Sequence, residues 1–171
     1  MMRGALLVLG LLGTVALIAA GALGYGLGGA SEEQVRSHVL LSLAATLLLV
    51  FSHTWIVLYL LATGRVISQV AAERSPGGAG GGDATRELLE RARRLRLRAL
   101  PWLLAAIAAL AATFLAGSAV VSGSIPAPVH QALFYVTLVA QGSAMLVERR
   151  VLAEHDRAGD ELRRRVEADA A

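Results

Sequence analysis

The sequence predicts an all-α membrane protein: a four-helix bundle with up-down-up-down topology and a helical extension on the cytoplasmic side. Of its 171 residues, 56% are hydrophobic and only 17% are charged, against about 25% charged in typical soluble domains. Three stretches contain no Asp, Glu, Lys or Arg, and they hold 28, 28 and 49 residues. A bilayer core needs about 20 apolar residues per helix. The first two stretches therefore fit one helix each, the third fits two, and residues 1–171 form a single membrane domain.

The four spans are expected at residues 5–27, 37–62, 99–121 and 129–147. The first is rich in small residues and has an alternative interpretation as a cleaved signal peptide. Its apolar run is longer than the roughly 7–15 residues of a signal h-region, so we expect a retained anchor. Between the third and fourth spans, residues 122–128 contain two Pro and one Gly, which predicts a tight turn.

Two hydrophilic segments lie outside the spans. The loop 63–98 contains a Gly-rich linker at 75–83, followed by a helix whose Leu88, Ala92, Leu95 and Ala99 share one face. The tail helix 148–171 continues span four without a break. We expect this tail to pair antiparallel with the helix that precedes span three. Two solvated helices lying apart are the alternative.

The positive-inside rule sets the orientation. With both termini in the cytoplasm, fifteen of the sixteen Arg lie inside and only Arg36 faces out. All sixteen basic residues are Arg, and Ala and Gly are abundant, as in GC-rich bacteria. The expected location is a bacterial inner membrane, with the lipid bilayer and other membrane subunits as partners. Topology explains the basic excess, so nucleic acid is not expected.

Most catalytic chemistry is excluded by what the sequence lacks. There is no Cys, and motifs of hydrolases, phosphate loops and zinc proteases are missing. The predicted spans contain no carboxylate and no internal Arg, which argues against an ion-coupled transporter. The remaining candidates are histidines, because ionisable groups inside a bilayer are costly and mark functional sites.

The histidines are spaced so that two pairs can form. His38 and His130 lie near the outer ends of spans two and four, which run parallel and are diagonal in a simple bundle. They therefore lie at similar depth and can converge on one ligand. His53 follows His38 by about four helical turns, or about 22 Å, and lies on roughly the same face. The same interval from His130 leads to Met145.

This spacing resembles that of di-haem cytochromes of the b type, in which parallel helices of a four-helix bundle each carry two histidines about four turns apart. The resemblance covers spans two and four and departs at Met145, where that family has His. It implies haem b with His38 and His130 as axial ligands of an outer haem iron. His53 and Met145 would serve an inner one. Another macrocycle such as chlorophyll fits the same histidines.

Structural alternatives stand beside each candidate. His38 and His130 can hydrogen-bond headgroups or water, His53 can be satisfied by a carbonyl or by Gln141, and Met145 can simply pack. His155 is expected to pack between the tail helices. Two further ligands are possible from the sequence. Trp55 and Tyr59 could line a quinone pocket, and an Arg cluster could contact anionic lipid or, as the alternative, a protein partner. That cluster comprises Arg91, Arg93, Arg94, Arg96 and Arg98.

The expected function is a small b-type haem subunit that transfers electrons within a respiratory or other redox complex, rather than an enzyme in its own right. The alternative is a non-catalytic structural or assembly subunit of a membrane complex. A small-solute carrier is a third possibility.

Overall fold

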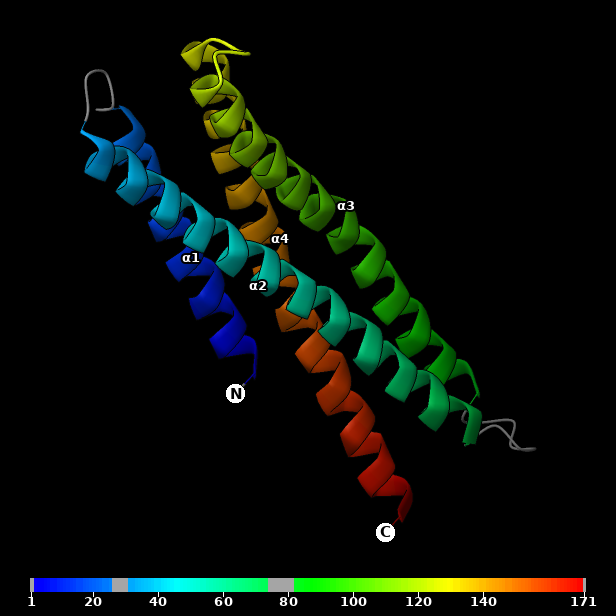
Figure 1. The fold of residues 1–171 in the computed structure, drawn as a ribbon. Helices are drawn as coiled ribbons and strands as arrows, with labels where there is room; N and C mark the ends of the chain where they lie inside the picture. Colours follow the sequence, from blue (N-terminus) through cyan, green and yellow to red (C-terminus); the bar gives the residue numbers. More distant parts are fainter. Residues whose placement is uncertain (1, 26–30, 74–81, 171) are drawn as a thin grey trace.

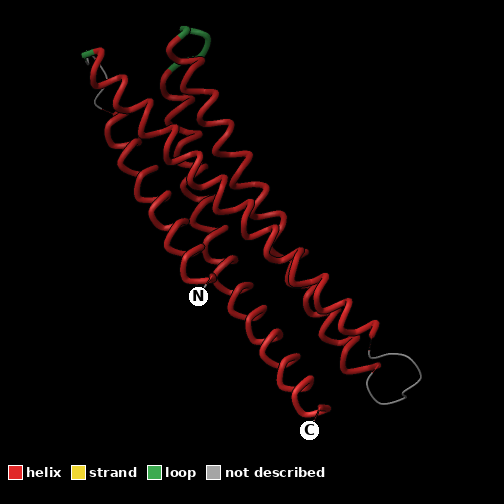
Figure 2. Tube along the Cα trace, turned by 60° about the horizontal axis from the view of Figure 1, so that its bottom comes forward, coloured by secondary structure: helices red, strands yellow, loops and turns green. Residues whose placement is uncertain are grey.

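The computed structural model is all-helical, and it describes residues 2–25, 31–73 and 82–170. Its four helices are α1 (Met2–Tyr25), α2 (Glu32–Glu73), α3 (Gly82–Val121) and α4 (Ala127–Ala170). They lie alongside one another with nearly parallel axes (Figures 1 and 2). The Gly-rich linker predicted at 75–83 falls almost wholly outside the described residues, and residues 82 and 83 already belong to α3.

The helices extend well beyond the predicted spans. Residues 63–73, expected in a loop, continue α2 without interruption, because no Pro or consecutive Gly occurs before Pro76 to stop helix propagation. The helix before span three and span three itself form one element, α3, which passes through Pro101. The fourth span and the tail likewise form one helix, as predicted.

Local signals in the sequence account for the helix ends near the two turns. Ser31 and Gln34 form a reciprocal capping box: the Gln34 side chain accepts from the Ser31 backbone N–H at 2.9 Å, and the Ser31 hydroxyl accepts from the Gln34 N–H at 3.4 Å. At the end of α3, Gly123 has a φ of 73°, and the Ser124 N–H donates to the Ala119 carbonyl at 2.8 Å. This is a Schellman-type ending, which only a residue tolerant of the left-handed region forms without strain.

The packing is built from two helical hairpins. α1 packs mainly on α2 and α3 mainly on α4, while α2 and α3 join the hairpins; of the pairs in contact, α2 and α4 touch least. The end of α1 and the turn after α3 lie at one end of the molecule, and both termini lie toward the other (Figure 1). Leu88, Ala92 and Ala158 form a hydrophobic cluster, which confirms the predicted pairing of the tail with the start of α3.

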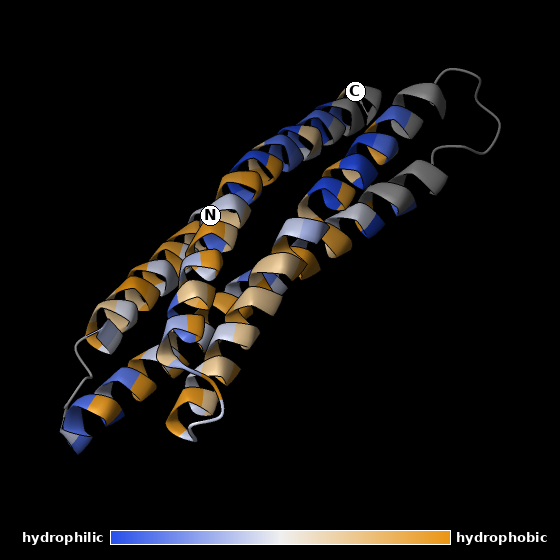
Figure 3. Ribbon diagram, turned by 90° about the horizontal axis from the view of Figure 1, so that it is seen from above, coloured by the Kyte–Doolittle hydropathy of each residue, from blue (hydrophilic) through white to orange (hydrophobic). Residues whose placement is uncertain are grey.

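Buried positions on α4 alternate at intervals of four and three residues, the heptad pattern of helices that pack along their whole length. They are Thr137, Gln141, Ala144, Glu148, Val151, His155 and Ala158. Hydrophilic residues gather on the C-terminal part of α4 and the N-terminal part of α3, whereas the middle of the molecule is mostly hydrophobic (Figure 3). The helical pair therefore changes from an apolar to a charged exterior along its length.

In the part of the chain that the structure describes, three helices are long and apolar enough to cross a membrane. The segments are Gly4–Tyr25, Glu32–Val66 and Glu87–Val121. Three such helices are consistent with a membrane protein in contact with a lipid bilayer. α4, which contains the fourth predicted span, is not among them.

Candidate functional site

His38 lies on α2 against a glycine of α1. Its Nδ1 is 2.8 Å from the carbonyl oxygen of Ala20, and because a carbonyl only accepts, Nδ1 carries the proton and donates it. A Cβ on Gly24 would lie 2.7 Å from the Cε1 atom of His38, so only glycine leaves room for the ring. The Ala20 carbonyl thus fixes the tautomer in which Nε2 carries a free lone pair.

His130 lies on α4 against a glycine of α3. A Cβ on Gly117 would lie 3.3 Å from its Cε1 atom. The Nδ1 atom of His130 is buried and has no hydrogen-bond partner among the described residues. A buried polar atom without a partner is unfavourable, and it calls for an explanation.

The two hairpins share one feature. In each, a histidine of the second helix lies against a glycine of the first, His38 against Gly24 and His130 against Gly117. We call His38 and His130 the paired histidines. That they share one ligand stays a prediction.

His53 lies elsewhere, in a cluster that is closed on itself. It is fully buried, and its Nδ1 is 2.5 Å from the Oε1 atom of Glu148. Its Nε2 is 2.8 Å from the amide nitrogen of Gln141. In the simplest arrangement Nδ1 donates to the carboxylate, and Nε2 accepts from the amide. We call His53, Gln141 and Glu148 the central cluster.

The central cluster confirms one structural alternative and corrects another expectation. Gln141 satisfies His53 across the molecule, as the sequence suggested. Glu148, however, was assigned to the solvated start of the tail, whereas it is only 3% exposed. Counting charges alone ends the fourth span just before Glu148, so the sequence predicts this carboxylate outside the packed interior. The heptad pattern of α4 shows instead that Glu148 points inward.

The predicted inner haem site does not fit these contacts. Both ring nitrogens of His53 are engaged by other side chains, so an iron would have to displace Glu148 or Gln141. The Sδ atom of Met145 is 3.2 Å from the hydroxyl of Thr14 on α1, so the sulfur lies against a neighbouring helix of the protein. His53 and Met145 therefore do not fit a shared role as iron ligands.

The residues weighed for a quinone do not share a pocket. Trp55 is 44% exposed and stacks on Phe51, with ring centroids 5.7 Å apart. Tyr59 instead donates its hydroxyl to Asp156 at 3.0 Å. The Trp55 ring faces outward and the Tyr59 ring faces α4, so the two rings do not point toward a common quinone.

His155 is buried beside α2 rather than only between the tail helices. Thr63 donates its hydroxyl to the Tyr59 carbonyl at 2.6 Å, so the hydroxyl oxygen accepts from Nε2 of His155. The Nδ1 atom has no partner among the described residues. Burial lowers the pKa of His155 below its ordinary value, and the nearby Asp156 opposes that shift only in part. His155 is therefore a neutral packing residue.

Sequence reasoning missed the two glycine seats and Glu148. The seats had a detectable signal, because Gly24 precedes His38 by fourteen residues and Gly117 precedes His130 by thirteen. Among the residues that the structure describes, no group of three or more His, Asp or Glu lies close enough to hold a metal ion. No protein family model, curated protein or solved structure matches the chain.

Proposed function

We propose that the chain is a small b-type haem subunit of the bacterial inner membrane, which crosses the bilayer four times as an up-down-up-down bundle. It would hold one haem between His38 and His130 and pass electrons within a larger redox complex. The observation that carries the proposal is the repeated arrangement of the paired histidines. Each is seated on a glycine of the neighbouring helix. His38 also donates to a backbone carbonyl, and the Nδ1 atom of His130 has no partner among the described residues.

The distribution of polar and apolar side chains around α4 supports the fourth span. Its hydropathy is low because Thr137, Gln141 and Glu148 are polar, yet these residues are 0%, 0% and 3% exposed. Its exposed side chains in the same stretch are apolar or aromatic: Val129, Tyr135, Val136, Val139 and Leu146. A helix with its polar side inward and its apolar side outward suits lipid better than water. The distribution of Arg then favours both termini in the cytoplasm.

The residues of this chain fit one haem better than two. A bound haem b supplies a reversible one-electron change at its iron. The Ala20 carbonyl orients His38 so that Nε2 is available as an axial ligand, a common arrangement for metal-bound imidazoles. Gly24 and Gly117 let both rings lie close to the neighbouring helices.

The test is colour. Protein purified in mild detergent from haem-replete cells should show a Soret band that shifts on dithionite reduction, with one haem per chain by pyridine haemochrome. His38→Ala and His130→Ala should each abolish the band, whereas Gln131→Ala, next to His130, should retain it. A colourless wild-type preparation would overturn the proposal.

A structural or assembly subunit is the second candidate, and the α3–α4 extension favours it. The cluster of Leu88, Ala92 and Ala158 holds together a long helical pair with a charged exterior, which suits the docking of a soluble partner. A colourless protein that nevertheless copurifies with other membrane subunits would support this candidate instead.

A further inference from the structure

A pocket between α2 and α3 combines a basic rim with an apolar wall. Its volume is about 440 Å³, within the range of about 300–1,000 Å³ typical of small-ligand sites. The lining is Leu60, Leu61, Gly64, Arg65, Leu89, Glu90, Ala92, Arg93 and Arg96. The pocket lies near the end of the apolar segment of α2, which runs to Val66, and beside the Arg-rich part of α3.

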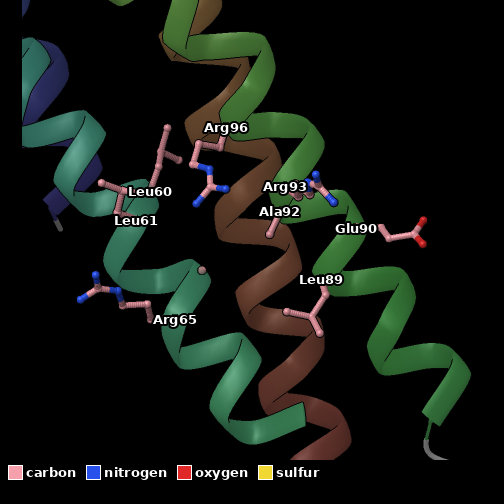
Figure 4. A pocket seen from close by; sticks show the side chains of 9 residues that line it. Leu60, Leu61, Arg65, Leu89, Glu90, Ala92, Arg93 and Arg96 are labelled. Atoms are coloured by element: carbon pink, nitrogen blue, oxygen red, sulfur yellow. The ribbon is translucent and has the colours of Figure 1, made fainter. Parts of the chain in front are cut away.

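The charge of the rim is positive. Arg93 and Arg96 of α3 line it, and the one carboxylate of the lining, Glu90, is paired at 3.3 Å with Arg94, which is outside the lining. Arg96 is half-buried and reaches from α3 toward α2, where Leu60 and Leu61 lie (Figure 4). Arginine is well suited to phosphate because its planar fork donates two parallel hydrogen bonds.

We infer that this pocket binds the phosphate of an anionic phospholipid, with the acyl chains running along the Leu60 and Leu61 side. A soluble phosphate would use the Arg rim but leave the apolar wall without a partner, whereas a phospholipid uses both. On the proposed topology the pocket lies at the cytoplasmic membrane boundary, where lipid headgroups are found. The inference thus rests on that orientation but not on haem binding.

Two kinds of variant test the site. Arg93→Gln with Arg96→Gln removes two charges from the rim, and Arg91→Gln with Arg98→Gln removes the same charge from the same helix outside the lining. Gly64→Leu fills the pocket without changing charge, because a Cβ at Gly64 meets nothing within 4 Å. Gly142→Leu is its control, since Gly142 is also open and lies outside the pocket.

Binding is measured on delipidated full-length protein by native mass spectrometry and thermal shift. The probes are phosphatidylglycerol, phosphatidylcholine, inorganic phosphate and glycerol 3-phosphate. We expect phosphatidylglycerol to bind at least tenfold more tightly than phosphatidylcholine. That preference should be lost in the rim variant and in Gly64→Leu, and kept in both controls.

Three results would overturn the inference: equal binding of the two lipids, equal loss in the rim variant and its control, or full stabilisation by the soluble phosphates. The Soret band is recorded on the same samples. A colourless protein that still prefers phosphatidylglycerol would refute the haem proposal alone, and a coloured one without lipid preference would refute the lipid site alone.

Discussion

The paired histidines and the central cluster place the same residue type in opposite situations. In the central cluster, His53, Gln141 and Glu148 are 0–3% exposed and use one another's polar atoms. In the paired histidines, each ring is half-buried and lies against a glycine of its own hairpin. The Nδ1 atom of His130 has no partner among the described residues. A network whose polar atoms are paired with one another stabilises the packing of helices. A buried ring nitrogen without a partner is able to bind a ligand.

Breaking the central cluster should have the largest effect. His53→Leu leaves the Glu148 carboxylate buried without a partner, which costs about 3–5 kcal/mol in systems of this kind. The free energy of unfolding, measured by SDS titration in mixed micelles, should fall by that amount. Glu167→Gln, at an exposed position, should change it by less than about 0.5 kcal/mol.

The double variant His53→Leu/Glu148→Leu gives the sharper result. Replacing both members of a buried pair by apolar residues is often neutral, so the double variant should recover more than half of the loss. If the two single losses simply add, His53 and Glu148 are not coupled, and the central cluster does not act as a closed network.

The next effect concerns the glycine seat of His38. Gly24→Ala introduces a Cβ 2.7 Å from the ring, which forces the imidazole to move and should cost about 1–3 kcal/mol. The same variant should lose the Soret band. Gly142→Ala, where a Cβ meets nothing within 4 Å, should be neutral or stabilising by up to about 1 kcal/mol. Retention of the full band in Gly24→Ala would show that the seat does not position His38.

These contrasts also show what the sequence can and cannot predict. Runs without charge predict helices and spans, because the hydrophobic length that a bilayer requires is a property of composition. The partner of His53 was partly predictable, since Gln141 lies on α4 at a matching depth. Glu148 was not, because the carboxylate ends a charge-free run and only the heptad pattern of α4 shows that it points inward. The glycine seats depend on which helices become neighbours, and that information is not local.

A smaller effect is expected from His155 at low pH. Burial lowers its folded-state pKa, so below the ordinary histidine value of about 6.5 the unfolded chain takes up a proton that the folded chain does not. Stability should therefore fall as the pH drops from 7.5 to 5.5. His155→Gln should lose less free energy of unfolding over that interval than the wild type. Equal pH dependence in both proteins would contradict the assignment of His155 as a neutral buried residue.

The smallest effect returns to the paired histidines themselves. His38→Asn removes one hydrogen bond from the Ala20 carbonyl, which also serves the backbone of α1, and the site is half-buried. Without haem, the free energy of unfolding should change by only about 0.5–1 kcal/mol, the net value of one such bond. The Soret band, by contrast, should disappear completely. A loss of stability as large as that of His53→Leu would mean that His38 is a packing residue like His53. The central cluster and the paired histidines would then both be structural, and the contrast between them would not identify a binding site.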